Sequence, residues 1–414
     1  MKKRVLVIGG GASGIVAAII AARHGATVSI LEHQDKIGKK LLLTGNGKCN
    51  LTNLRLGLSN YVTTNQEDKD FINHALNAYS PQQVISFFHS IGLRTTVLRD
   101  SYVYPETEAS ASVVSVLLRE LQKLHVEILT NQHVSSLSKK DKRICIISNK
   151  QTFFADSVIV ACGGKSYPKT GSDGSGFDIL RHMHLQYVEP YPALTSLICN
   201  HKGCKILSGM RNQAGVSILD SKHSVIAGDQ GQIQFTDYGI SGIPVFQVSS
   251  KIYPYLLKHN HARLTDLTAR IDLFPYEEEE KLFLQLDRQL NDYHSFSFEE
   301  ALSGFLHKKW IQFFSSQYSL SNKTGKEIKK STIKQLAHDM KNLDFPIKEL
   351  KGFDFCQVTG GGLELSELNH NFELKRYPSV FVTGELLNIT GDCGGYNLHW
   401  AFLSGMIAGE KAAD

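Results

Sequence analysis

The sequence predicts an α/β protein in which a parallel sheet flanked by helices is interrupted by a second domain, part β-barrel-like and part helical. At the amino terminus an apolar strand runs into a glycine-rich turn and a small-residue helix, and further strands ending at glycine-rich turns follow near residues 160 and 380. From about residue 191, short β runs separated by Gly, Ser and Asp replace this pattern. The 414 residues are enough for two or three domains of about 150 residues.

Composition is that of an ordinary globular protein. Hydrophobic residues make up 42% and charged residues 21%, which excludes a disordered or low-complexity chain. The formal charge of +5 is spread along the chain. The basic clusters Lys139–Arg143 and Lys326–Lys330 are short, and we interpret them as solvated surface rather than a nucleic-acid track. No apolar run approaches the roughly 20 residues of a membrane span.

The seven cysteines include no C-x-x-C pair, and no Cys/His spacing matches a zinc site. We therefore expect free and mostly buried thiols, no metal, and the reducing environment of the cytoplasm. The basic start and the apolar stretch after it resemble a signal peptide, but glycines interrupt that stretch and have a better explanation.

The first thirty residues follow a strand, turn, helix and strand pattern. The predicted elements are the strand Arg4–Ile8, the helix Ile15–Ala22 ending before Gly25, and the strand Thr27–Leu31. Gly9, Gly11 and Gly14 lie between the first strand and the helix in G-x-G-x-x-G spacing. Gly9 allows the tight turn, Gly11 lets a pyrophosphate approach the backbone, and Gly14 lets the helix pack closely on the sheet. The helix N-terminus then faces the anion.

Glu32 follows the second strand directly, 18 residues after Gly14. A carboxylate at about this spacing accepts a hydrogen bond from a ribose 2′-OH and disfavours a 2′-phosphate, so NADP is not expected at this site. The pattern predicts a dinucleotide-binding unit of Rossmann type. It does not by itself distinguish NAD from FAD.

Three later segments favour a flavin. Gly38–Asn53 (GKKLLLTGNGKCNLTN) offers backbone N–H groups, Asn and Thr side chains and lysines to a phosphate and a ribityl chain. Ser157–Gly164 (SVIVACGG) returns the sheet to the nucleotide edge. After a strand at Val380–Thr383, Gly391–Asn397 (GDCGGYN) opens a second helix, whose N-terminus can stabilise negative charge at N1 and O2 of a reduced flavin. A nicotinamide cofactor needs no second glycine-rich loop and helix N-terminus of this kind.

With these segments, the motifs ACGGKSYPKTGSDGSG, FTDYGISG, QVTGGG and GELLNITGDCGGYNLHWAFLSGMIAG resemble the BaiN/YhiN-like family of bacterial flavoproteins over the whole chain. That family includes aminoacetone-oxidase-like FAD enzymes and 3-dehydro-bile-acid reductases. The resemblance implies FAD, and a discontinuous Rossmann-like FAD-binding domain with an inserted β-barrel-like plus helical domain. The residues predicted to bind the cofactor are Gly9, Gly11, Ala12, Ser13, Gly14, Glu32, Lys39, Lys40, Thr44, Gly45, Asn46, Lys48, Cys49, Asn50, Val134, Ala161, Cys162, Gly163, Gly384, Glu385, Gly394, Gly395, Tyr396, Asn397 and Leu398.

We place the FAD-binding domain at residues 1–190 and 352–414 and the inserted substrate domain at 191–351, β-rich over 191–250 and helical over 255–345. Other predicted elements are helices at Asp68–Tyr79, Gln82–Ile91, Glu108–Leu124, Tyr276–Leu290, Phe298–Phe314 and Lys326–Asn342, a hairpin at Leu93–Tyr104, and strands within Val126–Ile147. No second G-x-G-x-x-G unit appears in the sequence, so NAD(P)H is expected to dock transiently at the flavin.

A flavin reductase of a C=C bond conjugated to C=O needs an acid for the α-carbon and a donor for the enolate oxygen. The candidates are Tyr238, Tyr396, Tyr167, Asp237 and Tyr104. Tyr238 and Tyr396 rank first because both lie in glycine-rich loops expected to face the isoalloxazine. Asp237 and Asn388 stand where the family commonly has His and Asp, and Asn371–Lys375 replaces a segment that usually contains Thr-Met. These positions are expected to flank the substrate cleft, so the departures bear on which substrate the protein binds.

The predicted function is the NAD(P)H-driven, FAD-dependent reduction of such a bond in a hydrophobic substrate of the 3-oxo-steroid or 3-dehydro-bile-acid type. One alternative is an FAD-dependent, aminoacetone-type amine oxidase that uses O2. Another is an RNA-associated flavoprotein. The expected partner is a small hydrophobic substrate, with no nucleic acid and no membrane span; no oligomeric state is predicted.

Overall fold

The computed structural model describes residues 2–414 and separates them into two units. Unit 1 consists of the chain up to Ala193 together with Phe353–Asp414, and unit 2 is Leu194–Gly352. A discontinuous α/β domain with an inserted barrel is therefore confirmed as the fold class.

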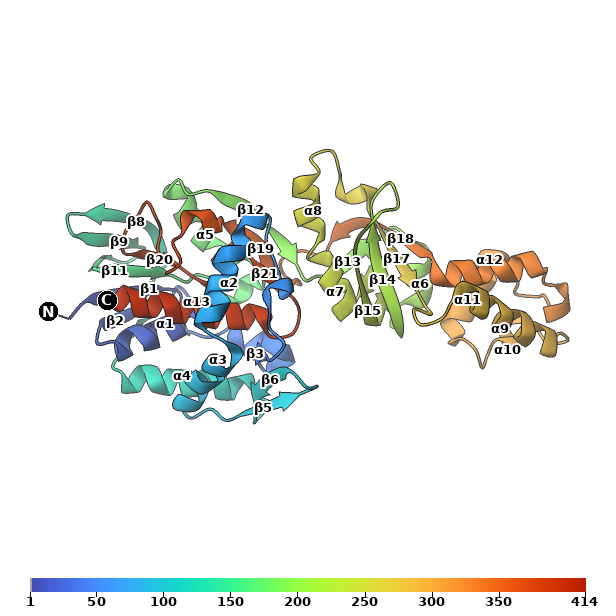
Figure 1. Cartoon of the computed structure of the whole chain (residues 1–414), viewed down its shortest axis with the longest axis horizontal. Coiled ribbons are helices and arrows are strands. Elements are labelled where there is room, and N and C mark those ends of the chain that lie inside the picture. The colour runs from blue at the N-terminus through green and yellow to red at the C-terminus, as the bar shows by residue number, and fades with distance from the viewer. Residues whose placement is uncertain (1) are drawn as a thin grey trace. The chain divides into compact units, whose positions relative to one another are not determined.

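Unit 1 is built on a five-stranded parallel sheet in the order β20-β11-β1-β2-β7. Its strands are β1 (Arg4–Ile8), β2 (Thr27–Leu31), β7 (Glu127–Leu129), β11 (Ser157–Val160) and β20 (Val380–Val382). The apolar runs β1, β11 and β20 are buried almost throughout because both faces of the sheet are covered. Figure 1 shows α1 (Ala12–Arg23) on one side of this sheet and the small sheet that contains β8 (Val134–Lys140) and β9 (Arg143–Ser148) on the other.

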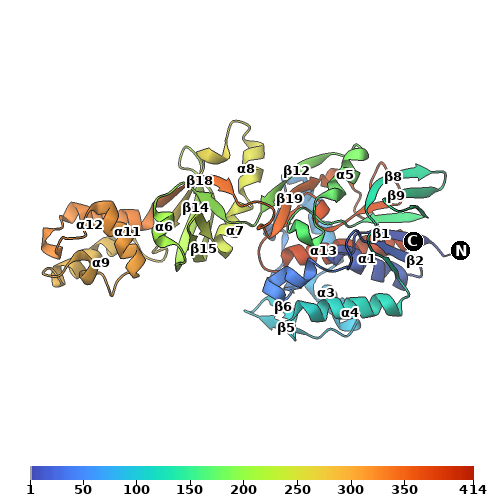
Figure 2. The ribbon, with the colours of Figure 1, turned by 180° about the vertical axis from the view of Figure 1, so that it is seen from behind.

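The first and last helices of the chain, α1 and α13 (Tyr396–Ala413), lie side by side in Figures 1 and 2. Glycines make this approach possible. A Cβ on Gly405 would lie 2.4 Å from the Ser13 carbonyl oxygen, and one on Gly409 would lie 2.5 Å from the Ala17 carbonyl oxygen. The two parts of the discontinuous unit are thus joined by backbone-to-backbone packing.

Smaller elements complete unit 1. Its other helices are α2 (Lys69–Ala78), α3 (Pro81–Ser90), α4 (Ser110–Lys123) and α5 (Ser175–His182). Its other strands are β3 (Thr52–Asn53), β4 (Tyr61–Val62), β5 (Thr95–Leu98), β6 (Tyr102–Pro105), β8 (Val134–Lys140), β9 (Arg143–Ser148), β10 (Thr152–Ala155), β12 (Tyr187–Ala193), β19 (Val358–Leu363) and β21 (Thr390–Gly391). The predicted hairpin is confirmed as the antiparallel β5–β6 pair, and Ser80 caps the start of α3 directly before Pro81.

Unit 2 contains a closed barrel of six strands in the order β13-β16-β15-β14-β17-β18. The strands are β13 (Leu197–Cys199), β14 (Arg211–Leu219), β15 (Val225–Thr236), β16 (Gly239–Ser241), β17 (Thr268–Asp272) and β18 (Leu343–Leu350). The helices are α6 (Gly203–Leu207), α7 (Ile243–Ser249), α8 (Ile252–Lys258), α9 (Glu279–Asp292), α10 (Phe298–Ala301), α11 (Lys308–Tyr318) and α12 (Lys330–Lys341). Phe235, Trp310 and Phe345 belong to one buried core, so barrel and helices form a single hydrophobic cluster.

Two predictions for unit 2 need correction. β17 and the start of β18 lie in the stretch expected to be helical, while α7 lies in the stretch expected to be β-rich. The single helix predicted over Phe298–Phe314 is two helices: α10 ends at Ala301, and the His307 side chain accepts a hydrogen bond from Lys309 N at the start of α11. The spacing of apolar residues continues from α10 into α11, so the sequence pattern does not indicate that the helix is interrupted.

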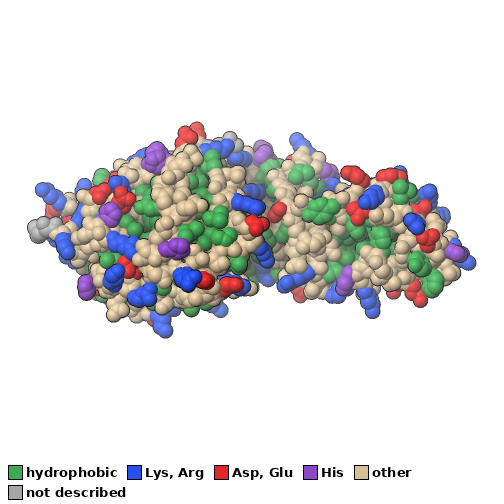
Figure 3. Space-filling view, turned by 60° about the horizontal axis from the view of Figure 1, so that its bottom comes forward, with side chains coloured by type: hydrophobic (Ala, Val, Ile, Leu, Met, Phe, Trp, Pro, Cys, Tyr) green, Lys and Arg blue, Asp and Glu red, His purple; other side chains and the backbone are tan. Residues whose placement is uncertain are grey.

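Within residues 2–414 no helix has the length and apolar character needed to cross a membrane. On the face shown in Figure 3, acidic and basic side chains are interspersed.

The α1–α13 contact predicts the effect of Gly409→Ala. Gly→Ala inside a helix ordinarily stabilises by up to about 1 kcal/mol. Here we expect a loss of about 1–3 kcal/mol, because the new methyl group would overlap the Ala17 carbonyl. Urea unfolding measures the change, with Gly57→Ala as the control because a Cβ there meets only Asn60 Oδ1, at 3.9 Å. A Gly409→Ala variant as stable as that control would contradict the packing.

Candidate functional site

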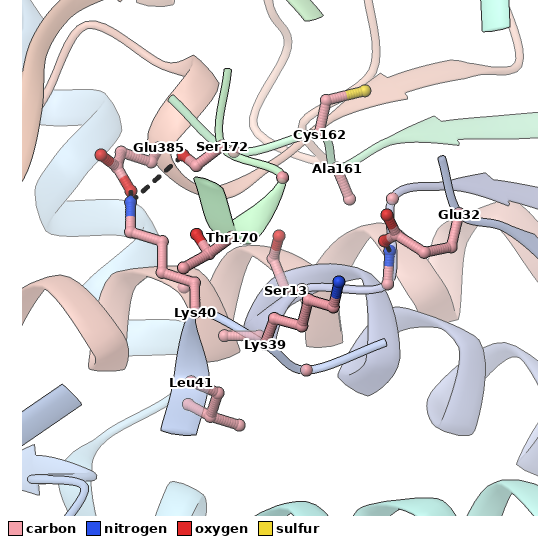
Figure 4. A pocket seen from close by; sticks show the side chains of 18 of the residues that line it. Ser13, Glu32, Lys39, Lys40, Leu41, Ala161, Cys162, Thr170, Ser172 and Glu385 are labelled. Carbon is pink, nitrogen blue, oxygen red and sulfur yellow. Dashed lines mark hydrogen bonds and ion pairs between the residues drawn. The ribbon is translucent and has the colours of Figure 1, made fainter. Parts of the chain in front are cut away.

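A cavity lies at the carboxyl ends of β1, β2 and β11, within unit 1. Its lining comes from six parts of the chain: 8–13, 31–44, 132–134, 161–179, 357–358 and 385–401. Figure 4 shows Glu32 toward one end and Lys40 with Glu385 toward the other, with Ser13 and Lys39 between them. Ligands of open α/β sheets bind at this edge.

The glycine turn after β1 has the geometry that its spacing predicts. Gly9 adopts a φ of +101°, and a Cβ there would lie 2.4 Å from the Ala161 carbonyl oxygen. A Cβ on Gly14 would lie 2.0 Å from the Gly9 carbonyl oxygen. A Cβ on Gly11, by contrast, would meet nothing within 4 Å. Gly9 and Gly14 are thus required by packing, whereas Gly11 leaves open space at the N-terminus of α1, where a pyrophosphate would lie.

Glu32 is 7% exposed and lines the cavity, where the sequence predicts that it meets the adenosine ribose. Its Oε2 accepts from Gly10 N at 2.8 Å, and its Oε1 accepts from Gln34 N at 2.8 Å. These two bonds fix the carboxylate and still leave lone pairs for the hydroxyls of a ribose.

A polar network connects the 38–53 segment to the end of β20. Lys40 Nζ lies 2.6 Å from Glu385 Oε2 and 3.2 Å from Ser172 Oγ. Glu385 Oε1 accepts from Ser166 Oγ at 2.9 Å and from Thr359 N at 2.7 Å. The network fixes four segments around one end of the cavity, and the sequence did not predict that Lys40 and Glu385 pair.

The GDCGGYN segment leads into α13, and its last residue, Asn397, lines the cavity. Asn397 Oδ1 accepts from Gly391 N, and Asn397 Nδ2 donates to Gly391 O, both at 2.8 Å, so the side chain fixes the loop. A Cβ on Gly395 would lie 2.9 Å from the Thr52 carbonyl oxygen. The loop therefore packs directly on the 38–53 segment, and α13 begins with its N-terminus at the cavity, where Asn397 and Leu398 line the wall.

His399 ties the first turn of α13 to two distant segments. Its Nδ1 lies 2.8 Å from Thr52 Oγ1, and its Nε2 lies 3.1 Å from the carbonyl oxygen of Tyr79. The ring is fully buried, and burial lowers the pKa of His399 to about 4. A neutral ring that donates to Tyr79 and accepts from Thr52 satisfies both contacts.

The cavity fits FAD. Open space at Gly11 beside the N-terminus of α1 suits the pyrophosphate, Glu32 suits the adenosine ribose, and the N-terminus of α13 suits the electron-rich edge of an isoalloxazine. Lys39 lies between these ends, and Lys40 is paired with Glu385 at one of them. The residues present therefore suit a dinucleotide that carries a large ring.

The structure brings most of the predicted cofactor residues to this cavity. Those that line it are Gly9, Gly11, Ala12, Ser13, Glu32, Lys39, Lys40, Thr44, Val134, Ala161, Cys162, Gly163, Glu385, Asn397 and Leu398. The others, which belong to the adjoining backbone and lie outside the lining, are Gly14, Gly45, Asn46, Lys48, Cys49, Asn50, Gly384, Gly394, Gly395 and Tyr396. Contact of either group with the cofactor stays a prediction.

Several lining residues were missed: Gly10, Gln132, His133, Thr170, Gly171, Ser172, Gln357, Val358, Ile389, Trp400 and Ala401 are examples. The segment KSYPKTGSDGSG was recognised as glycine-rich, so Thr170–Ser172 had a signal. Gln357 and Val358 begin the motif QVTGGG, so they had a signal as well, and the pairing of β12 with β19 brings them to the cavity.

The catalytic candidates are divided between the units. Tyr104, Tyr167 and Tyr396 belong to unit 1, where burial raises the pKa of each phenol and none of the three lines the cavity. Tyr396 is 7% exposed and packs edge-on against Tyr61. Asp237 and Tyr238 belong to unit 2. Their catalytic roles stay predictions.

The cysteines are free, as expected. Burial raises the pKa of both Cys49 and Cys162 to about 12, so neither is a ready thiolate. Over residues 2–414 no group of three or more His, Cys, Asp or Glu side chains is arranged to hold a metal ion.

Fold and cavity together define a Rossmann-type oxidoreductase fold with a site for FAD. The HI0933-like protein Rossmann domain family matches residues 3–411, and the chain belongs to this family. It is 38% identical to the 3-dehydro-bile acid delta(4,6)-reductase of Clostridium scindens over 99% of both chains. The resemblance stated from the motifs is thereby confirmed.

Two further relatives extend the comparison. The ribosomal RNA dihydrouridine synthase of Haemophilus influenzae is 26% identical over 96% of both chains. Among solved structures, the 3-ketosteroid delta1-dehydrogenase of Sterolibacterium denitrificans in complex with 1,4-androstadiene-3,17-dione is 12% identical, covers 99% of both chains and has a TM-score of 0.51. The structural likeness concerns the fold.

Gly11→Val tests the pyrophosphate site. The φ of −87° at Gly11 suits any residue, so the side chain should fill only the open space beside α1. We expect FAD affinity to fall at least about tenfold while the thermal unfolding of the apoprotein is unchanged. Flavin fluorescence during reconstitution with FAD measures the affinity. Unchanged affinity would place the pyrophosphate elsewhere.

The buried His399 ring should make the free energy of unfolding depend on pH. Its folded-state pKa of about 4 lies below the ordinary 6.5, so its contribution is present above pH 6.5 and is lost as the pH falls toward 4. His399→Gln should lose this dependence. Denaturant unfolding at several pH values measures it, with the exposed His182→Gln as the matched control. Parallel pH profiles for wild type and His399→Gln would show that the ring is not held neutral.

Proposed function

We propose that this protein is an NAD(P)H-driven, FAD-dependent reductase of a C=C bond conjugated to a carbonyl group. The substrate class we favour is a hydrophobic 3-oxo-steroid or 3-dehydro bile acid. The observation that carries this proposal is the 38% identity, over 99% of both chains, to a 3-dehydro-bile acid delta(4,6)-reductase. The cavity with two helix N-termini agrees with it.

In this proposal the residues of the chain bind and orient the cofactor. Bound FAD supplies hydride transfer from N5. The N-terminus of α1 and Glu32 would hold the adenosine diphosphate half, and the N-terminus of α13 would stabilise negative charge on the ring edge. The Lys40–Glu385 pair keeps the 38–53 segment against the site without adding net charge.

The reductant is expected to bind transiently. Residues 2–414 contain one parallel sheet, in unit 1, and its glycine turn belongs to the FAD site. A nicotinamide would therefore approach the flavin without a Rossmann unit of its own. Once the first product has left, the conjugated substrate would take its place.

A second substrate class is favoured by a specific observation: relatives that match 96% of this chain are ribosomal RNA dihydrouridine synthases. A uracil ring also carries a C=C bond conjugated to a carbonyl, so the same hydride and proton addition applies. The RNA-associated alternative thus becomes a reductase of the same bond type on a different substrate.

Anaerobic mixing of the FAD-loaded protein with NADH or NADPH tests the proposal. We expect the flavin colour to bleach, to return slowly in air, and to return rapidly with a 3-oxo-steroid or 3-dehydro bile acid. Rapid return with a ribosomal RNA transcript but with no steroid would move the assignment to the second class. Bleaching by aminoacetone together with fast return in air would establish the amine oxidase alternative and contradict the proposal.

A further inference from the structure

A histidine of unit 1 lies between two carboxylates at the Glu32 end of the cavity. His33 directly follows Glu32 in the sequence and lines the cavity. His33 Nδ1 lies 3.3 Å from Glu32 Oε1, and His33 Nε2 lies 3.6 Å from Asp173 Oδ2. The two nitrogens of one ring therefore face carboxylates that come from two different segments of the chain.

The protonated form of the ring suits this position best. A neutral imidazole carries one N–H group, so one of its nitrogens would present a lone pair to a carboxylate, whereas an imidazolium donates from both nitrogens. Within residues 2–414, His33 Nε2 is buried and makes no hydrogen bond, and the carboxylate that it faces is that of Asp173. Imidazoles take up their second proton between about pH 5 and pH 8.

Asp173 supplies a constant negative charge over that range. Burial by itself raises the pKa of the Asp173 carboxyl, but hydrogen bonds from Ser175 and the charge of His33 hold that pKa below its ordinary value. Asp173 Oδ1 accepts from Ser175 N at 2.9 Å, and the other oxygen is the one that faces His33. The attraction between the two side chains therefore depends on the protonation of His33.

Asp173 belongs to the segment 165–175, which forms one wall of the cavity. Its lining residues include Thr170, Gly171, Ser172 and Ser175, and Figure 4 shows Thr170 and Ser172 at the cavity. A Cβ on Gly171 would lie 2.8 Å from Gln34 Cγ and 3.1 Å from His33 Cε1. The segment 165–175 is thus packed directly against the residues that follow β2.

Polar contacts anchor the same segment at the other end of the cavity. Lys165 N and Ser166 N donate to Thr359 Oγ1 at 2.7 and 3.0 Å. Ser172 Oγ lies 3.2 Å from Lys40 Nζ. The His33–Asp173 contact is therefore the charged contact that holds the wall at the Glu32 end.

An anionic cofactor makes the charge of His33 important. Glu32 and Asp173 bring two negative charges to the end of the cavity where the adenosine diphosphate half of FAD is expected. A protonated His33 compensates one of them and fixes the wall, whereas a neutral ring leaves both carboxylates to repel the pyrophosphate. A wall that is already fixed also costs less to order when the cofactor binds.

Four other ionisable side chains line the cavity around His33. The His133 ring packs edge-on against His33, with the ring centroids 6.0 Å apart. Cys162 stays a neutral thiol, because burial raises its pKa to about 12. Lys36 and Lys39 complete the set, and lysines keep their charge where imidazoles titrate. His133 can titrate in the same range as His33, so it has to be tested beside it.

We propose that His33 is a positioning residue for the cofactor: its protonated ring, held between Glu32 and Asp173, keeps the segment 165–175 against the adenosine diphosphate half of FAD. This role concerns cofactor retention and does not depend on which substrate the flavin reduces. Because the bound state favours the protonated ring, binding and protonation are linked with one sign. Affinity is highest at acidic pH and falls as the pH rises through the value at which the ring of the bound state loses its proton.

Calorimetric titration of the FAD-free protein with ADP-ribose tests the proposal without flavin or substrate. This probe carries the adenosine diphosphate half, and its pyrophosphate does not titrate near neutral pH. We expect the affinity to fall about three- to fivefold between about pH 6 and pH 8. Buffers of different ionisation enthalpy should report proton uptake on binding near neutral pH. His33→Gln should abolish both effects, and His33→Lys should restore tight binding at both pH values without proton uptake.

Asp173→Asn should reduce the proton uptake, with Asp178→Asn as the matched control because Asp178 pairs with Arg181 and lies outside the lining. The rate at which FAD leaves the loaded protein, followed by flavin fluorescence, should rank the variants in the same order. If ADP-ribose binds too weakly to measure, this rate carries the comparison. Equal wild-type affinity and release at both pH values would overturn the proposal. So would a pH effect that persists in His33→Gln and disappears in His133→Gln.

Discussion

The close contact between α1 and α13 is the constraint on which the site in unit 1 depends. These helices come from opposite ends of the chain, and Gly405 and Gly409 let the backbone of one touch the backbone of the other at Ser13 and Ala17. A side chain at either glycine would separate them. With the contact made, the glycine turn after β1 and the GDCGGYN loop open onto the same cavity.

This packing has an electrostatic consequence. Two helix N-termini meet at one cavity, so their unpaired N–H groups are available to a pyrophosphate and to a redox-active ring. Charged side chains in the wall are mostly compensated: Lys40 is paired with Glu385, and Glu32 is held by two backbone N–H groups. The site can bind a large anionic dinucleotide without an uncompensated buried charge. The second helix N-terminus, that of α13, is the physical basis for assigning FAD rather than a nicotinamide to unit 1.

Much of this architecture could be predicted from patterns of residues that lie close together in the sequence. Gly9, Gly14 and Glu32 follow from backbone geometry and hydrogen bonding within the first thirty residues, and the strand Arg4–Ile8 has its predicted ends. The Lys40–Glu385 pair was not predictable, because it joins residues 345 positions apart. The barrel-like insertion was predicted, but β17 and the start of β18 were not, because they lie in a stretch of helical pattern and only their pairing with β14 and β13 defines them. The contact between the Lys351 ammonium and the Tyr238 ring, 3.9 Å from its centroid, likewise exists only after the barrel closes.

The central claim is that one FAD molecule spans the two helix N-termini of unit 1. A crystal structure of the protein with FAD bound tests this most directly. The account predicts the adenosine ribose at Glu32, the pyrophosphate at Gly11, and the N1 and O2 edge of the isoalloxazine at the backbone N–H groups that begin α13. An isoalloxazine bound away from α13, or a nicotinamide dinucleotide occupying the glycine turn in place of FAD, would contradict it.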